Sequence, residues 1–237
     1  MISKSAPDLP RTALVVGGTG AVGTELLQEL IVSGRYGRIL CVGRRLPELV
    51  SEVVIGHLVD FEHLEDFLPE GRVDDVFCAL GTTLERAGSV AAFKRVDFEY
   101  VLKVGELAKR LGARTLSVIS SIAADPSANS IYLQTKGAME AALIALDLPA
   151  LHLFRPSLLA GSLKRTDFRL KEVLANGALA VLGPLFLHGR FRKYRRIAPA
   201  VVARAMAQCV SNGGVGTIIY ENDAILDLCV SPSKSLS

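Results

Sequence analysis

A glycine-rich turn between an apolar run and a helix-like segment constrains the fold of this chain more than any other feature. Residues 13–16 are apolar, and residues 24–32 have the apolar spacing of a helix. Such a turn points several backbone N–H groups at one spot, where the helix dipole adds partial positive charge. The pattern predicts the pyrophosphate-binding turn of a dinucleotide site. Its residues are Gly17, Gly18, Thr19, Gly20, Ala21, Val22 and Gly23.

The end of the next predicted strand, at residues 38–43, indicates which dinucleotide is bound. Folds that prefer NAD place an acidic residue there, against the ribose 2′-hydroxyl. This chain has Arg44 and Arg45 instead. Two guanidinium groups can hold a 2′-phosphate through charge-assisted hydrogen bonds, so we expect NADP(H) as the cofactor. The alternative is a pair of solvated arginines on a loop.

Strand-like and helix-like segments alternate along the chain, as a parallel sheet with crossover helices requires. Predicted strands lie near residues 12–17, 38–43, 53–58, 74–79, 114–120, 150–154 and 217–220. Predicted helices lie near residues 21–33, 61–68, 89–111, 131–147, 167–182 and 199–211, with a short one after Glu221. The expected fold is α/β, a doubly wound parallel sheet or Rossmann fold. We expect a single domain over residues 1–237, in which residues from about 160 to 237 form a small, variable substrate-side region.

Charge and cysteine content narrow the classes of function. The net charge of +3 over 237 residues is too small to suggest nucleic-acid binding. The four cysteines (Cys41, Cys78, Cys209 and Cys229) lie far apart, so we expect neither a disulfide framework nor a zinc site or any other metal centre. The N-terminus is short and polar, without a secretory signal, and a reducing cytoplasm is the expected location.

An apolar stretch followed by a basic run raises the question of a membrane surface. Residues 174–187 are strongly apolar, and residues 190–196 are rich in arginine. The apolar stretch is too short to span a bilayer, although the whole segment 174–196 could make weak contact with an anionic membrane surface. We favour a core helix followed by a solvated basic loop.

Tyr132 and Lys136 form a second motif, because residues four apart share one face of a helix. A neighbouring lysine lowers the pKa of a tyrosine, since it favours the phenolate. Such a tyrosine can exchange a proton with a carbonyl or alcohol near neutral pH. The pair follows Ser120 and Ser121 at a predicted strand end, where a hydroxyl can hold the substrate oxygen. The alternative is an exposed tyrosine and lysine on a surface helix.

Together, the glycine turn, the two serines and the Tyr-x-x-x-Lys pair resemble the short-chain dehydrogenase/reductase superfamily. Several segments more narrowly resemble its atypical branch that contains the Tat-interacting protein. They are residues 42–45, 59–62, 78–83, 95–103, 132–137 and 154–157. The resemblance extends over nearly the whole chain, from about residue 12 to residue 230. It implies NADPH binding and a regulatory or catalytic role.

The resemblance also implies roles at the catalytic positions. Ser121, rather than Ser120, would be the catalytic serine. Tyr132 would be the acid/base, and Lys136 would be its activator and a ligand of the nicotinamide ribose. Two departures from the family pattern stand out. Ser121 and Tyr132 are separated by a short interval, which requires a tight loop, and Asp97 stands where many relatives carry a structural asparagine.

At the cofactor, the resemblance assigns the remaining contacts to the ends of the other strands. Asp60, with Phe61 beside it, resembles the aspartate that contacts the adenine amino group. Residues Leu80, Gly81, Thr82 and Thr83 resemble the loop along the adenosine ribose and phosphates. Pro156 resembles the proline whose neighbouring backbone faces the nicotinamide.

These observations predict an NADPH-binding oxidoreductase that transfers hydride to or from an unidentified carbonyl or alcohol substrate. The substrate is expected to be a small molecule, and the basic run could hold an acidic tail on it. A second hypothesis is a non-catalytic NADPH-binding regulator, and a third is an accessory protein at a membrane surface. A sugar-nucleotide epimerase is less favoured, because few residues remain after Phe154 to build a lobe for the nucleotide sugar. The sequence does not distinguish monomer from dimer.

Overall fold

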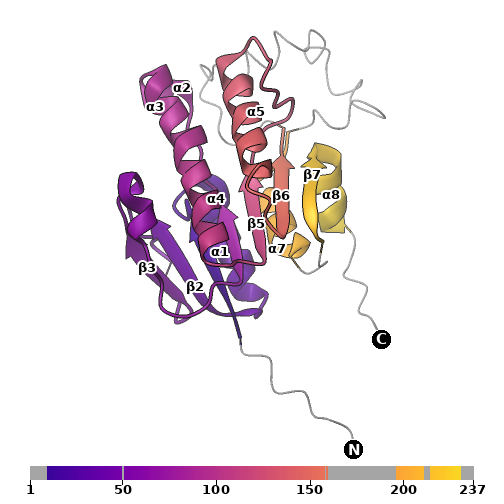
Figure 1. Ribbon diagram of the computed structural model, residues 1–237. Helices are drawn as coiled ribbons and strands as arrows, with labels where there is room; N and C mark the ends of the chain where they lie inside the picture. The colour runs from indigo at the N-terminus through magenta and orange to yellow at the C-terminus, as the bar shows by residue number, and fades with distance from the viewer. Residues whose placement is uncertain (1–9, 50, 158, 160–195, 211–213, 231–237) are drawn as a thin grey trace, which may run out of the picture.

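A parallel sheet forms the centre of the computed structural model, which describes residues 10–49, 51–157, 159, 196–210 and 214–230 (Figure 1). Within these residues the sheet has seven strands in the order β3-β2-β1-β4-β5-β6-β7. They are β1 (Arg11–Val16), β2 (Tyr36–Gly43), β3 (Val54–Leu58), β4 (Asp75–Cys78), β5 (Thr115–Ile119), β6 (Ala150–Arg155) and β7 (Gly216–Glu221). Every neighbouring pair is parallel. The strand order reverses direction between β1 and β4, and the predicted doubly wound α/β fold is confirmed.

Helices cover both faces of the sheet (Figure 1). On one face lie α1 (Ala21–Val32), α7 (Pro199–Cys209) and α8 (Asn222–Val230), and on the other lie α4 (Tyr100–Arg110) and α5 (Ile131–Ile144). Shorter helical segments are η1 (Phe61–Asp66), α2 (Leu84–Ala87), α3 (Val90–Lys94) and η2 (Arg95–Glu99). The predicted helix at 167–182 and most of the predicted substrate-side region lie outside the described residues.

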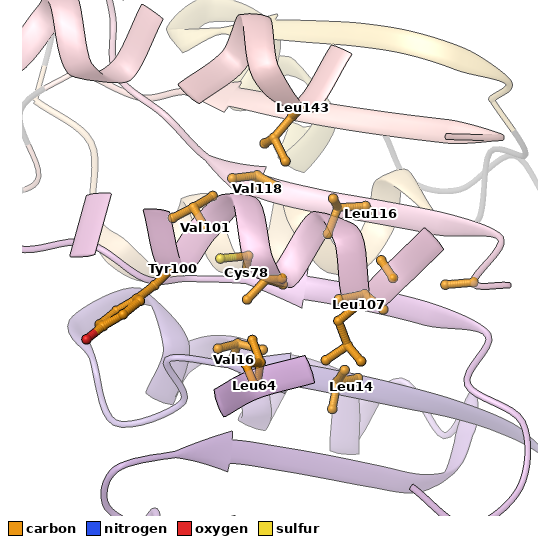
Figure 2. Packing of buried hydrophobic residues seen from close by; sticks show 14 of the residues in the cluster. Leu14, Val16, Leu64, Cys78, Tyr100, Val101, Leu107, Leu116, Val118 and Leu143 are labelled. Carbon is orange, nitrogen blue, oxygen red and sulfur yellow. The ribbon is translucent and has the colours of Figure 1, made fainter. Parts of the chain in front are cut away.

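Alternate residues of the strands supply two separate cores, since successive strand side chains point to opposite faces. Leu14 and Val16 of β1 pack with Cys78 and Val118 under α4 and α5 (Figure 2). Ala13 and Val15, the other residues of the same strand, pack under α1 and α7. Burial on both faces explains the nearly continuous apolar runs of the inner strands.

The single helix predicted at 89–111 is interrupted in the structure. It consists of α3, then the π-helical segment η2, then α4. Asp97 lies within η2 and is fully buried. A π-turn accommodates one extra residue, and such turns are frequent at functional sites. Apolar periodicity does not reveal the interruption, because the residue turned inward here is a carboxylate.

The ends of two other helical segments follow from local chemistry. Gly112 follows Leu111, the C-cap of α4, and adopts φ +63°, the left-handed conformation that ends helices. The predicted helix at 61–68 is a 3-10 segment, η1, which begins after Asp60. The short helix α2 was not predicted, and the Thr83 hydroxyl caps it by accepting from the N–H of Arg86 at 3.0 Å.

Candidate active site

The glycine turn joins β1 to α1 with close backbone packing. Gly17 adopts φ +88°, and a Cβ there would lie 2.8 Å from the carbonyl carbon of Ala79. A Cβ on Gly23 would overlap the carbonyl oxygen of Gly17. Gly20 is the N-cap of α1 and provides no side-chain hydrogen bond. The N-terminus of α1 therefore has the form of an anion site, since no capping side chain competes for its N–H groups.

Some predicted residues of this turn are exposed and available to a ligand, whereas others are buried and hold the turn in place. Thr19, Gly20 and Ala21 are exposed, whereas Val22 and Gly23 are buried. The hydroxyl of Thr24, which was not predicted, donates to the carbonyl of Gly18 at 3.2 Å and thereby ties the first turn of α1 to the glycine turn. A phosphate would meet mainly backbone here, which explains the need for small residues.

The predicted adenosine-binding residues lie after β2 and β3. Arg44 and Arg45 are exposed directly after β2. Asp60 accepts from the N–H of Glu62 at 3.0 Å and thereby caps η1. The Phe61 side chain is buried and stacks on Tyr100, with ring centroids 5.1 Å apart. The ring of Phe61 therefore belongs to the core.

Tyr100, Glu62 and Arg95 form a polar cluster beside these residues that the sequence analysis missed. The Tyr100 hydroxyl donates to Glu62 at 2.7 Å, and Arg95 pairs with Glu62 at 3.7 Å. Burial raises the pKa of Tyr100, the hydrogen bond to Glu62 adds to the rise, and the charges of Arg95 and Arg44 oppose it. The charges of Arg95 and Arg44 therefore both act on the Tyr100 hydroxyl. The available signal was that Arg95 and Tyr100 both lie in the segment 95–103.

The loop of Leu80, Gly81, Thr82 and Thr83 follows β4 and lies beside the glycine turn. The N–H of Ala79 donates to the carbonyl of Val16 at 2.8 Å, and the Ala79 backbone packs against Gly17. The N–H of Thr82 donates to Asp97 at 2.8 Å. The structure therefore brings two of the predicted cofactor segments together at the carboxyl edge of the sheet, where doubly wound folds bind ligands.

Ser120, Ser121 and Pro156 lie together after β5 and β6. The N–H of Ser120 donates to Phe154, and the N–H of Ile122 donates to Pro156 at 3.0 Å. Both serine side chains are buried. The hydroxyl of Ser121 donates to the carbonyl of Ile122 at 3.3 Å, whereas that of Ser120 has no partner within the described part of the chain. The choice of Ser121 as the catalytic serine stays a prediction.

The segment between Ser121 and Tyr132 folds back onto α5, as its short length requires. Ala123 adopts φ +60°, and the N–H of Ala124 donates to the carbonyl of Ser121 at 3.1 Å. A Cβ on Gly137 would overlap the backbone of Asp125 and Pro126. Gly137 therefore allows the loop to pack against the helix that carries Tyr132 and Lys136.

Tyr132 and Lys136 are buried on α5, with 7% and 3% of their surfaces exposed. These values exclude the alternative of an exposed pair on a surface helix. The Tyr132 ring packs on Phe93 with centroids 5.7 Å apart. Lys136 Nζ lies 3.5 Å from the carbonyl oxygen of Ile119, at the end of β5 and directly before the two serines.

Asp97 is a partner of Lys136 that the sequence analysis did not predict. Its Oδ1 lies 2.8 Å from Lys136 Nζ, and both side chains are almost fully buried. The charge of the ammonium group is therefore compensated within the protein. The sequence signal was the departure at Asp97 from the family pattern that the resemblance implies, but the partner of this carboxylate could not be read from the sequence.

The fold and this site define the class of protein. Residues 13–142, more than half of the chain, match the family described as the NAD dependent epimerase/dehydratase family, and the chain belongs to it. Protein HTATIP2 of Rattus norvegicus is 34% identical over 92% of this chain and 89% of the rat protein. Protein FMP52-1, mitochondrial, of Scheffersomyces stipitis is 32% identical over 75% of this chain and 77% of its own. The resemblance to the atypical dehydrogenase/reductase branch is thereby confirmed.

Solved structures agree with the fold. MoeE5 in complex with UDP-glucose and NAD aligns with a TM-score of 0.63 and 20% identity, over 88% of this chain and 74% of that chain. The Bordetella bronchiseptica enzyme WbmF in complex with NAD+ aligns with a TM-score of 0.64 and 19% identity, over 92% and 76%. At these identities the likeness concerns the fold alone.

The predicted cytoplasmic location is wrong. FMP52 proteins of Scheffersomyces stipitis, Debaryomyces hansenii and Eremothecium gossypii are all named mitochondrial. The prediction relied on unpaired cysteines and a missing secretory signal. The four cysteines are indeed free thiols, but free thiols report a reducing environment and do not distinguish between compartments that provide one.

The sequence predicts that the apolar stretch 174–187 does not span a bilayer and that residues 174–196 could contact a membrane surface. No helix among the described residues is long and apolar enough to cross a bilayer. The segment 174–196, with its predicted weak contact to a membrane surface, lies outside the described residues except for Arg196.

Proposed function

We propose that this protein is an NADP(H)-binding oxidoreductase of the atypical short-chain dehydrogenase type, acting on a small carbonyl or alcohol substrate. The observation that carries the proposal is the burial of Tyr132 and Lys136 beside the end of β5. The glycine turn lies at the same edge of the sheet, after β1. Proton-transfer groups and a dinucleotide cradle at one sheet edge are what carbonyl reduction requires.

Each residue of the proposed site has a separate role in the reaction. A bound nicotinamide would supply or accept the hydride. The Ser121 hydroxyl would hold the substrate oxygen, and the Tyr132 phenol would give a proton to that oxygen or take one from it. Lys136, held by Asp97 and the Ile119 carbonyl, would position the nicotinamide ribose. Burial of the pair excludes bulk water and strengthens these polar interactions.

The preference for NADP(H) rests on the cations at the adenosine end. Arg44 and Arg45 follow β2, where an acidic residue would favour NAD, and the charges of Arg44 and Arg95 both act on the Tyr100 hydroxyl. The family description names NAD, and the MoeE5 and WbmF complexes contain it, so cofactor choice is the point to test.

A fluorescence titration with NADPH and with NADH tests the cofactor. We expect Arg44→Ala/Arg45→Ala to weaken NADPH binding at least about tenfold, because charge-assisted hydrogen bonds to the 2′-phosphate are lost. NADH binding should stay unchanged in this variant. Arg72→Ala, at the opposite end of the sheet, is the control and should bind both cofactors as the native protein does. Equal affinity of the native protein for NADPH and NADH would refute the preference.

Turnover of a panel of carbonyl compounds tests the assigned chemistry. Tyr132→Phe keeps the ring on Phe93 but removes the proton donor, so we expect the rate to fall about 10²- to 10⁴-fold. Tyr220→Phe, a half-buried tyrosine on β7, is the matched control. Equal rates in the native protein and Tyr132→Phe would exclude the acid/base role. NADPH binding without any turnover would instead favour the regulatory hypothesis.

A sugar-nucleotide epimerase is the second candidate. The family name and the UDP-glucose complex of MoeE5 favour it. Epimerisation returns the hydride to the same substrate, so it would interconvert UDP-sugars without net change in nicotinamide absorbance. NMR of UDP-glucose incubated with the protein and cofactor separates the two candidates.

A further inference from the structure

The buried carboxylate of Asp97 bridges two segments of the site that are far apart in the sequence. Asp97 Oδ1 lies 2.8 Å from Lys136 Nζ on α5. Asp97 Oδ2 accepts from the backbone N–H of Thr82 at 2.8 Å, in the loop after β4. Asp97 itself has no exposed surface. One side chain therefore fixes both the proposed catalytic lysine and the loop proposed to lie along the adenosine.

The bridge uses both oxygens of one side chain. A carboxylate accepts through both oxygens, whereas an amide offers one oxygen and turns its NH₂ group toward the other partner. Thr82 provides a hydrogen bond to Oδ2, whereas Lys136 provides an ion pair to Oδ1, which has no hydrogen-bond partner among the described residues. An asparagine would therefore satisfy one of them and present a donor to the other, and a buried donor without an acceptor is costly.

The local backbone supports this placement. Asp97 lies in the π-helical segment η2, which interrupts the helical run and turns the carboxylate inward. The loop after β4 passes directly against the carboxylate, since a Cβ on Gly81 would lie at ordinary contact distance, 3.5 Å, from Asp97 Oδ1. Asp97 is the one buried carboxylate of this helical run, and the π-turn occurs at this residue. Because π-turns are frequent at functional sites, this placement favours a functional role for Asp97.

We propose that Asp97 is a positioning residue that couples the cofactor loop to Lys136, and that it must be a carboxylate to do so. The functional consequence of this coupling rests on the proposed function: a dinucleotide bound along residues 80–83 would set the position of Lys136 through Asp97. The bridge itself is a property of the protein without cofactor, and it is tested separately.

Hydrogen exchange of the Thr82 amide, followed by NMR without cofactor, tests the bridge. In Asp97→Asn the amide oxygen should face the ammonium of Lys136, the stronger donor, so Thr82 should lose its acceptor and exchange at least about tenfold faster. In Asp97→Asn/Lys136→Met no ammonium competes, so the amide oxygen can turn to Thr82. Exchange at Thr82 should then return to near the native rate.

This rescue separates positioning from a merely structural role. If Asp97 only filled space, the double variant would be at least as disturbed as Asp97→Asn. Asp66→Asn removes the same charge at an exposed position and should leave Thr82 exchange unchanged. Unchanged exchange in Asp97→Asn, or equally fast exchange in the double variant, would overturn the proposal. Asp97→Asn leaves the buried charge of Lys136 without its partner, whereas the double variant removes both charges. The double variant should therefore fold even if Asp97→Asn does not.

NADPH titration then measures the functional consequence. We expect the dissociation constant of Asp97→Asn to rise at least about tenfold, while that of Asp66→Asn stays native. A native dissociation constant in Asp97→Asn would overturn the coupling. If the native protein bound no NADPH, the proposed function would fail, whereas the Thr82 exchange rates would still decide whether Asp97 bridges the two segments.

Discussion

At the residue scale, the missing side chain of Gly23 allows α1 to begin directly against the glycine turn. The position that a Cβ would occupy is filled by backbone atoms of Gly17. Backbone cannot move aside as the end of a flexible side chain can, so the contact excludes every other residue. The same reasoning applies at Gly137, where the loop after Ser121 crosses α5. Both glycines act through close approach of the chain to itself.

Gly23→Ala should weaken NADPH binding while leaving the sheet intact. Relieving the overlap requires a shift of the turn, and overpacking of this kind costs about 1–3 kcal/mol, which corresponds to roughly five- to 150-fold in affinity. Gly34→Ala is the comparison, because Gly34 follows the other end of α1 and its Cβ would meet nothing within 4 Å, so NADPH binding should stay unchanged. Fluorescence titration measures both, and equal losses in the two variants would contradict the argument.

At the scale of elements, Arg155 ties α5 to the last two strands. It lies at the end of β6 and donates to both carboxylate oxygens of Glu140 on α5, at 3.0 and 2.6 Å. It also donates to Glu221 at the end of β7, at 3.0 Å. The hydrogen bonds to Glu140 raise the pKa of Arg155, so it stays charged. Because Glu140 is one turn after Lys136, this network also fixes the helix that carries the proposed site.

Arg155→Met should destabilise the fold by about 3–5 kcal/mol, because Glu140 is left as a buried charge without its partner. The Glu140 side chain is 4% exposed, whereas that of Glu221 is 40% exposed. Glu221→Gln is therefore the control and should cost about 1 kcal/mol or less. Urea unfolding measures both. A loss for Arg155→Met no larger than that for Glu221→Gln would show that the network does not hold α5.

At the scale of the whole molecule, His152 lies inside the sheet and links global stability to pH. It is almost fully buried on β6, stacks on Tyr220, and its Nδ1 lies 3.2 Å from the Tyr220 hydroxyl. Burial lowers the pKa of His152 below its ordinary value of 6.5, and Asp75 opposes the shift in part. The unfolded chain therefore takes up this proton at a higher pH than the folded protein does.

The free energy of unfolding should consequently decrease as pH falls below about 6.5 and be insensitive to His152 above it. The limiting slope for one proton is about 1.4 kcal/mol per pH unit. His152→Gln, which can still bond to Tyr220, should remove this contribution, whereas His63→Gln at an exposed position should retain it. Urea unfolding between pH 5 and pH 8 measures the slopes. Parallel slopes for the native protein and His152→Gln would contradict the assignment.

The sequence by itself determined the features whose causes are local. Apolar runs located the strands, because burial on both faces leaves little room for polar residues. The glycine turn located the junction of β1 and α1, since a sharp turn from strand to helix follows from backbone conformation. Tyr132 and Lys136 could be paired because four residues along a helix return to the same face.

Only the tertiary structure decided which side chains from distant segments meet. The ion pair of Lys136 with Asp97, the approach of Thr82 to Asp97 and the group around Tyr100 each join segments that no periodicity connects. The π-turn that aims Asp97 inward was equally hidden, because a helical pattern with one extra residue still reads as a helix. Such contacts depend on how strands and helices stack in space, and their partners are therefore fixed by packing rather than by local pattern.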